Sequence, residues 1–334
     1  MLQPRRTAAY SHMSQRSQRK NVVAQGSAVI VTGGKGFLGR FVVDELANRG
    51  YENIIALGSS DCDLVDAAAT DDLFARIRPA GVIHAAAAVG GIGANKDNPG
   101  WFSYANSVMG ANVLESARRH GADKVVSIGT ICVYPGDAPV PTPESAMFAG
   151  FPAGDTAPYG IAKRNLWMMG TAYREQYGLN AVFLIPTNLF GPHDHFEESR
   201  SHVIPALIRR FIDARENGDP EVVIWGDGSA TREFLYVSDA ARGIVDALER
   251  YDASDPVNLG TGYEVSIKAL AEEIREQVGY TGRLTWDTSK PTGAPRRSLA
   301  VERAKERLGF EANVSLEEGL RQTIEWYENE RKGE

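Results

Sequence analysis

A glycine-rich segment near the start of the chain, TGGKGFLG at residues 32–39, constrains the fold more than any other feature. It follows the β-branched run AVIVT and opens the stretch FLGRFVVDELANRG, whose apolar residues recur at helical spacing. Glycines in this context allow a sharp turn, close approach of backbone amides to a pyrophosphate, and tight helix–strand packing. The helix N-terminus adds partial positive charge. The segment therefore predicts a dinucleotide-binding loop formed by Gly33, Gly36, Phe37, Leu38 and Gly39.

Short apolar runs alternate with helical patterns as far as about residue 186. The runs are apolar throughout and are separated by stretches long enough for crossover helices, which is typical of a parallel sheet covered on both faces. The pattern predicts an α/β fold, a Rossmann-like doubly wound parallel sheet with a smaller C-terminal α/β substrate lobe. The expected strands of the sheet are 28–32, 53–57, 81–88, 124–129 and 181–186, and the expected helices are 37–50, 66–78 and 102–120.

The domain organisation follows from where this rhythm changes. After residue 188 the sequence turns to polar loops and shorter strands, and it closes on an amphipathic helix from about residue 315. A cleft between two lobes is the expected ligand site. We expect a disordered basic extension at 1–26, an NAD(P)-binding Rossmann domain at 27–188 with a return at 233–260, and a substrate-binding lobe formed by 189–232 and 261–334.

The charge and composition exclude several classes of protein. Residues 1–27 carry five basic and no acidic side chains, whereas the whole chain has a net charge of −7, so the body is acidic. An acidic body argues against nucleic acid as a partner. No stretch approaches the roughly 20 apolar residues that cross a bilayer. Two cysteines cannot form a disulfide framework, which favours a reduced, cytoplasmic location.

The end of the second expected strand bears on which dinucleotide binds. NAD sites usually place an acid there to hold the ribose hydroxyls, but this chain has Ser59 at that point. Lys35 and Arg40 are able to neutralise a 2′-phosphate, so NADPH/NADP is favoured over NAD. Asp63, next to Leu64, either binds the adenine edge or caps the following helix.

The motif YGIAK places Tyr159 and Lys163 four residues apart, on one face of a helix. A tyrosine hydroxyl titrates near 10, too high for ready proton donation at neutral pH. A nearby ammonium favours the phenolate and lowers that pKa. The pair therefore predicts a proton donor for a carbonyl that is being reduced.

A series of further motifs extends along nearly the whole chain after residue 28. In order they are AAAAVGGIGANKDNP, GTICVYP, YGIAK, IPTNLFGPHDHF, SHVIPALIRRF, VVIWGDGSATREFLYVSD and VNLGTG. Together they resemble the GDP-L-fucose synthase family of the extended short-chain dehydrogenases/reductases. The resemblance implies NADPH-dependent conversion of GDP-4-keto-6-deoxy-D-mannose to GDP-L-fucose, by 3,5-epimerisation and then hydride reduction at C4. It also implies a GDP-sugar as the ligand and a homodimer.

The resemblance assigns roles to further residues. It places the epimerisation acid/base pair on Cys132 and His202, and a thiol and an imidazole both titrate near enough to neutrality to exchange protons with carbon acids. Thr130 falls where the family has a serine that hydrogen-bonds the reacting carbonyl. Lys163, Asn188, Leu189 and His202 fall beside the cofactor, and Arg210, Trp225 and Arg232 fall where the family holds the nucleotide sugar.

Two points stay open at this level, the exact sugar and the function, whereas no metal site is expected. Thr292 stands where the family usually has an acid, which leaves the exact sugar undecided. One alternative function is a nucleotide-sugar epimerase, acting on a GDP-hexose, that keeps NAD(P) bound and performs no net reduction; another is a non-catalytic binding protein on the same scaffold. His193 and His195 flank one aspartate without a clear third ligand, so no metal is expected.

Overall fold

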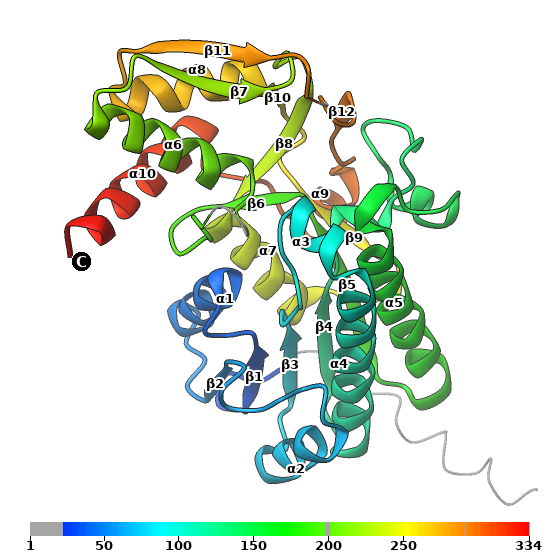
Figure 1. The fold of residues 1–334 in the computed structure, drawn as a ribbon. Coiled ribbons are helices and arrows are strands. Elements are labelled where there is room, and N and C mark those ends of the chain that lie inside the picture. Colours follow the sequence, from blue (N-terminus) through cyan, green and yellow to red (C-terminus); the bar gives the residue numbers. More distant parts are fainter. Residues whose placement is uncertain (1–22, 198–200, 291, 334) are drawn as a thin grey trace, which may run out of the picture.

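The computed structural model describes residues 23–197, 201–290 and 292–333, and its centre is a six-stranded parallel sheet (Figure 1). The strand order is β2-β1-β3-β4-β5-β9, so the order reverses between β1 and β3. This is the doubly wound arrangement that the sequence predicts. The strands are β1 (Val29–Thr32), β2 (Ile54–Leu57), β3 (Gly81–His84), β4 (Lys124–Ile128), β5 (Asn180–Pro186) and β9 (Val257–Leu259).

Helices cover both faces of this sheet, which explains why its strands are apolar throughout. On one face, Val29 and Val31 of β1 share a buried cluster with α1 and α7. On the other face, Ile30 of β1 lies in a cluster with α2, α4 and α5. Alternate residues of one strand therefore feed two separate cores. The helices are α1 (Phe37–Asn48), α7 (Val237–Arg250), α2 (Ala67–Ile77), α4 (Pro99–Arg119) and α5 (Ala157–Tyr177).

A second group of elements gathers at one end of the molecule, above the carboxyl ends of the central strands (Figure 1). Its own buried cluster is centred on Phe190, Phe211 and Leu270. The group contains a four-stranded sheet of β6 (Asn188–Phe190), β8 (Thr231–Tyr236), β10 (Glu264–Ser266) and β12 (Arg296–Arg297), the parallel pair β7 (Glu221–Trp225) and β11 (Arg283–Asp287), and helices α6 (Val203–Asn217), α8 (Ile267–Val278) and α10 (Leu316–Gly333).

Several local features differ from the sequence expectation. A short helix, α3 (Ile92–Asp97), forms in the glycine-rich stretch after β3, where no helix was expected, and β6 pairs with β8 where a polar loop was expected. Residues 23–26 do not belong to a disordered extension, because Val23 is buried and Gln25 pairs with Glu52; residues 1–22 lie outside the described part. The remaining elements are η1 (Ile131–Val133), η2 (Glu144–Phe148), η3 (Gly154–Thr156) and α9 (Glu302–Leu308).

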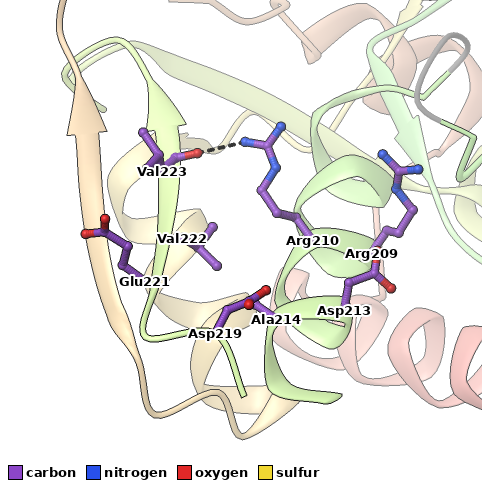
Figure 2. A pocket seen from close by; sticks show the side chains of 8 residues that line it. All are labelled: Arg209, Arg210, Asp213, Ala214, Asp219, Glu221, Val222 and Val223. Carbon is purple, nitrogen blue, oxygen red and sulfur yellow. Dashed lines mark hydrogen bonds between the residues drawn. The ribbon is translucent and has the colours of Figure 1, made fainter. Parts of the chain in front are cut away.

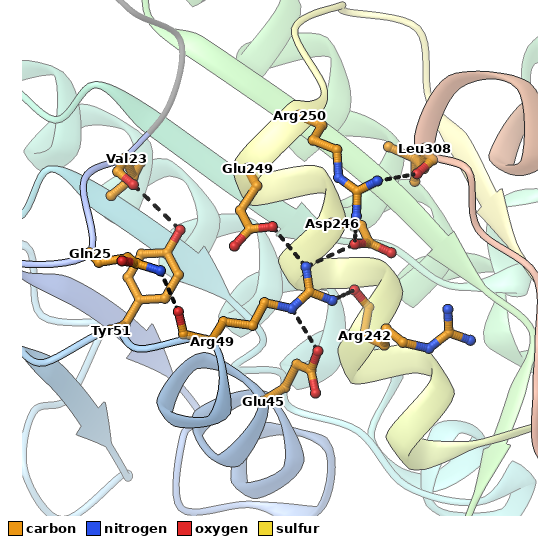
Figure 3. A network of polar contacts seen from close by, with 10 residues as sticks. All are labelled: Val23, Gln25, Glu45, Arg49, Tyr51, Arg242, Asp246, Glu249, Arg250 and Leu308. Atoms are coloured by element: carbon orange, nitrogen blue, oxygen red, sulfur yellow. Dashed lines mark hydrogen bonds and ion pairs between the residues drawn. The ribbon is translucent and has the colours of Figure 1, made fainter.

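An arginine at the end of α1 connects this helix to α7 (Figure 3). Arg49 is bonded to Glu45 at 2.7 Å and to Asp246 and Glu249 at 2.8 Å each. Burial disfavours its charge, but the hydrogen bonds to these three carboxylates outweigh that effect and raise the pKa of Arg49. The network fixes two helices that are far apart in sequence on one face of the central sheet.

Replacing Arg49 by methionine is expected to lower the free energy of unfolding by about 2–4 kcal/mol, because it removes one partner of the buried Asp246 carboxylate. Urea denaturation measures the change. Arg321, whose ion pair with Glu318 is exposed, supplies the control, and Arg321→Met is expected to change stability little. Equal effects of the two substitutions would contradict this role for Arg49.

Candidate active site

The glycine loop lies at the switch point of the sheet, where ligands of doubly wound folds bind. Gly33 has a φ of +71°, and a Cβ there would lie 2.9 Å from the backbone nitrogen of Ala86, which follows β3. A Cβ on Gly39 would lie 1.9 Å from the carbonyl oxygen of Gly33. Gly36 precedes α1, and no side chain caps that helix. The first-turn amides, including those of Phe37 and Leu38, therefore face a cradle with the shape and polarity that a pyrophosphate needs.

An ion pair occupies the end of β2. Lys35 Nζ lies 2.8 Å from Asp61, whose other oxygen accepts a 2.7 Å hydrogen bond from Gly58 N. The bond from Lys35 is the main cause that lowers the pKa of Asp61. Ser59 is exposed beside this pair, and the Arg40 guanidinium donates to the carbonyl oxygen of Lys35 at 3.0 Å. Asp61, the acid that follows the strand end most closely, is thus already paired with a cation.

The structure decides one alternative for Asp63. Asp66, not Asp63, caps α2, because its carboxylate accepts hydrogen bonds from Ala68 N and Ala69 N at 2.8 and 3.0 Å. Asp63 instead accepts one from Val65 N at 2.9 Å, in a tight turn. The capping role predicted as one alternative for Asp63 is therefore wrong. Leu64 is buried in the core beside α2.

Tyr159 and Lys163 lie on one buried face of α5. They are 7% and 2% exposed, and the Lys163 ammonium is 5.8 Å from the centroid of the Tyr159 ring. Burial lowers the pKa of Lys163 to about 8. Burial also raises the pKa of Tyr159, with a further contribution from Cys132. The expectation that Lys163 lowers the tyrosine pKa is therefore wrong for this structure, since burial has the largest effect on that pKa and raises it.

Cys132 and Thr130 adjoin this pair from the turn η1. The Thr130 hydroxyl oxygen accepts a 3.2 Å hydrogen bond from Cys132 N, and both side chains are half-buried. A Cβ on Gly160 would lie only 2.3 Å from the carbonyl oxygen of Cys132, so α5 packs directly on the backbone of η1. The structure thus brings Thr130, Cys132, Tyr159 and Lys163 together.

His202 lies on a different element from the other predicted catalytic residues. It precedes α6 and makes no side-chain capping bond. Its side chain is accessible to solvent, yet the protein around the ring lowers its pKa by desolvation, with a smaller contribution from His195. Among the described residues, no hydrogen bond joins His202 to Cys132 or Tyr159. The acid/base pairing of Cys132 with His202 therefore stays a prediction.

Asn188 and Leu189 follow directly from β5 into β6. The Asn188 amide donates to the carbonyl oxygen of Glu233 at 2.9 Å, and Leu189 packs against the core shared with α1 and α7. Glu233 itself is fully buried, and its carboxylate accepts from Thr261 N and Leu299 N at 2.6 and 2.7 Å. This carboxylate joins β8 to the segments after β9 and β12.

The three residues that were predicted to bind the sugar lie on α6, β7 and β8. Arg210 donates from Nη1 to the carbonyl oxygen of Val223 at 2.9 Å, across a pocket of about 240 Å³ between α6 and β7 (Figure 2). Trp225, on the same strand, is 65% exposed. Arg232 donates to the carbonyl oxygen of Ala294 at 2.7 Å, and burial lowers its pKa. The pocket is lined by Arg209, Arg210, Asp213, Ala214, Asp219, Glu221, Val222 and Val223.

Thr292 packs against the loop that follows β7. A Cβ on Gly226 would lie 3.2 Å from Thr292 Cα. The adjacent Asp227 has its pKa lowered by hydrogen bonds from Ser229 and, more weakly, from Thr292. A carboxylate is therefore present next to Thr292, from a segment far away in the sequence.

In the segment HDH, residues 193–195, the ring of His193 packs against two aromatic rings. His193 lies 4.8 Å from Trp326 and 6.4 Å from Phe41, between ring centroids. Within the described part of the chain, no group of three or more His, Cys, Asp or Glu side chains is arranged to hold a metal ion. No helix in that part is both long and apolar enough to span a membrane.

Two interactions near the site were missed from the sequence. The pairing of Lys35 with Asp61 needs the fold to bring together residues 26 positions apart. The buried ring of His84, at the end of β3, lies 2.8 Å from the hydroxyl of Thr32 at the end of β1. The one available signal for His84 was a histidine closing an otherwise apolar strand, GVIH.

The fold and the site together define a class. A glycine loop at the switch point, with a buried tyrosine–lysine pair on a neighbouring helix, is the arrangement of a nicotinamide-dependent epimerase or reductase. The model of the NAD dependent epimerase/dehydratase family matches residues 29–260. The chain belongs to this family. Relatives named GDP-L-fucose synthase, 38–41% identical to it, place it within the family among the GDP-L-fucose synthases.

Individual relatives support the narrower assignment. The chain is 41% identical to GDP-L-fucose synthase 1 of Arabidopsis thaliana over 93% of this chain and 96% of that protein. It is 38% identical to GDP-L-fucose synthase of Escherichia coli (strain K12), over 90% and 96%. Among solved structures, a GDP-L-fucose synthetase from Naegleria fowleri bound to NADP matches with a TM-score of 0.86 and 31% identity, over 93% of this chain and 97% of that one.

Proposed function

We propose that this protein converts GDP-4-keto-6-deoxy-D-mannose to GDP-L-fucose, by epimerisation at C3 and C5 followed by NADPH-dependent reduction at C4. The observation that carries the proposal is the grouping of Thr130, Cys132, Tyr159 and Lys163, from η1 and α5, around one point. The names of the relatives supply the substrate and the cofactor.

Epimerisation requires a group that removes a proton from carbon and a group that returns one on the opposite face. The C4 ketone acidifies the protons at C3 and C5, because the resulting anion is an enolate. Cys132 is half-buried beside the tyrosine and is proposed as one partner of the pair. His202, whose lowered pKa keeps its imidazole neutral at pH 7, is proposed as the other partner.

Reduction requires a proton donor for the C4 oxygen. NADPH supplies the hydride when it is bound. Burial raises the pKa of Tyr159, so its hydroxyl carries the proton that the reaction needs. The neighbouring Lys163 ammonium is proposed to favour the phenolate, so that this proton is donated as negative charge develops on the carbonyl oxygen. Lys163 then stabilises the phenolate that is left, and the Thr130 hydroxyl donates a second hydrogen bond to the same oxygen. Asn188 and Leu189, which enter β6 beside this point, are proposed to contact the nicotinamide.

The sugar nucleotide is proposed to lie against α6, β7 and β8. Arg210 and Arg232 supply forked donors suited to a diphosphate, and the exposed Trp225 ring is available for stacking. Residues 27–188 with the return at 233–260 are proposed as the cofactor-binding part, and 189–232 with 261–334 as the substrate-binding part. Of these segments, β8 pairs with β6 and lies outside the central sheet.

Lys35 is proposed to select NADPH over NADH by pairing with the 2′-phosphate. Lys35→Met should raise the KM for NADPH about 10- to 100-fold and leave the KM for NADH unchanged, because a charged hydrogen bond to phosphate contributes about 1.5–3 kcal/mol. Steady-state kinetics with both cofactors measure the change. Lys305→Met, which breaks a comparable surface pair with Glu311, is the control. An equal rise for both cofactors would contradict the assignment to Lys35.

We also propose a cytoplasmic homodimer, formed through α4 and α5. Large apolar side chains are exposed on these two helices, which lie side by side. Sedimentation equilibrium of the wild type and of Met168→Glu measures the association. The exposed side chains are Trp101, Tyr104, Ile161, Met168 and Tyr177.

The proposed function is tested by following the absorbance of NADPH at 340 nm on addition of GDP-4-keto-6-deoxymannose. One mole of NADPH should be consumed for each mole of sugar converted. An epimerase that keeps its nicotinamide bound would convert sugar without net consumption, and a binding protein would convert none. Either of these outcomes would overturn the proposal.

A further inference from the structure

A buried histidine links the dinucleotide loop to the centre of the sheet. His84 is 1% exposed and Thr32 is fully buried; His84 Nδ1 lies 2.8 Å from the Thr32 hydroxyl oxygen. The same oxygen accepts a 3.3 Å hydrogen bond from Ala86 N. Thr32 immediately precedes Gly33 of the loop, so the pair fixes the ends of β1 and β3 to each other where the cofactor crevice opens.

The register of the sheet places this ring on the face that α5 covers. Ile30, Val82 and Val125 lie in one buried cluster with Leu166 of α5. Two residues further along the strands, Thr32, His84 and Ser127 are register partners on the same face, at the carboxyl edge. Lys163 precedes Leu166 by three residues, so it shares the inward face of the helix. Since α5 runs back from that edge, Lys163 lies on the side of Leu166 where His84 stands.

The electrostatics agree with this placement. The positive charge of Lys163 acts on His84 and, after the larger effect of burial, lowers the pKa of the imidazole to about 3. His84 is therefore neutral at all working pH values. Its Nδ1 is occupied by Thr32, which leaves Nε2 as the nitrogen available to the lysine.

We propose that His84, held by Thr32, is a positioning residue that supports Lys163 from the sheet side and stabilises its ammonium form. A hydroxyl both donates and accepts, so Thr32 can hold either tautomer of the ring. With Nδ1 protonated and bonded to Thr32, Nε2 is a free acceptor for the ammonium. The imidazole supplies polarity that a buried lysine otherwise lacks, without adding a charge.

The proposed role predicts the direction in which the pKa of Lys163 changes when the imidazole of His84 is removed. Burial holds the pKa of Lys163 near 8, so its positive charge is lost as the pH rises through that value. Without the imidazole acceptor the ammonium is less stable and its charge is lost at lower pH. Tyr159, on the same helix as Lys163, is also titratable, and its pKa is raised by burial with a further contribution from Cys132 on η1. A Cys132→Ser background removes the thiol from the comparison.

The experiment measures two pH profiles in that background. The first is the dissociation constant of NADPH, followed by its fluorescence, which does not depend on turnover. The second is kcat/KM for reduction, which rests on the proposed function. His84→Leu should move the alkaline limb of both profiles down by about one to two pH units, as expected for a lost hydrogen bond to a charged group. Thr32→Val should move them the same way, and Thr32→Ser should restore them.

The controls separate positioning from folding. Ser127→Ala, the neighbouring position on the same face, should leave both profiles unchanged. Unfolding by urea reports whether each variant is folded, and the two Thr32 variants keep the test valid should His84→Leu fail to fold. Profiles of Thr32→Val that coincide with those of Thr32→Ser would overturn the proposal. If the wild type binds NADPH but reduces no sugar, the proposed function is wrong. The pH profile of NADPH binding then still tests the role of His84.

Discussion

Replacing Tyr159 by phenylalanine should lower kcat for NADPH oxidation by about 10²- to 10⁴-fold, the usual contribution of a general acid. The ring is buried on α5, so phenylalanine keeps its packing and removes only the hydroxyl. Stopped-flow absorbance at 340 nm with saturating GDP-4-keto-6-deoxymannose measures the rate. The substitution should leave the dissociation constant of the sugar nearly unchanged, because the proton is donated only as the carbonyl is reduced.

Tyr173→Phe is the matched control for this substitution. Tyr173 lies on the same helix, and its hydroxyl donates a 3.0 Å hydrogen bond to Glu115. The Tyr173→Phe variant should oxidise NADPH at a rate within about twofold of the unaltered protein. A tyrosine outside the site makes no bond to the reacting oxygen. A Tyr159→Phe variant as fast as this control would mean that another group donates the proton.

The second large effect is expected for Cys132→Ala. In heavy water, this variant should incorporate deuterium at C3 and C5 about 10²- to 10⁴-fold more slowly than the unaltered protein, because it lacks one partner of the acid/base pair. It should still reduce the C4 ketone, since Tyr159 and Lys163 remain. Mass spectrometry and NMR of the product locate the label.

Cys62→Ala provides the comparison for the thiol. Cys62 is the other cysteine of the described chain; it lies against the core beside α2, and burial raises its pKa. Its removal should leave the labelling rate unchanged. Full labelling by Cys132→Ala would remove this thiol from the epimerisation step and leave His202 to be tested with other partners.

The central sheet was predictable because its signals are local. Apolar runs bounded by glycines and helical periodicities gave β1, β2, β4 and β5 to within a residue or so. The missed elements carry weaker signals. Strand β6 has three residues inside a polar segment, β12 has two arginines, and α3 begins in a glycine-rich stretch. Their structure depends on pairing with β8 or on packing, which no short window of sequence contains.

The candidate site likewise combines local motifs, which the sequence predicts, with contacts between distant segments, which it does not. Motif spacing was enough to nominate the Tyr159 and Lys163 pair, because one helical turn separates them. Contacts between distant segments were not accessible: the pairing of Lys35 with Asp61, and the bond between Thr32 and His84. The direction of the tyrosine pKa was also wrong, because sequence shows a neighbouring lysine but not the burial that outweighs it.

The most direct test of the account combines label and cofactor in one reaction of the unaltered protein. GDP-4-keto-6-deoxymannose and NADPH are incubated in heavy water, and both NADPH consumption and the position of deuterium are measured. One NADPH should be oxidised per sugar, with deuterium at C3 and C5 and none at C4, because the hydrogen at C4 comes from the cofactor. Deuterium incorporation without NADPH oxidation, or reduction without label at C3 and C5, would contradict it.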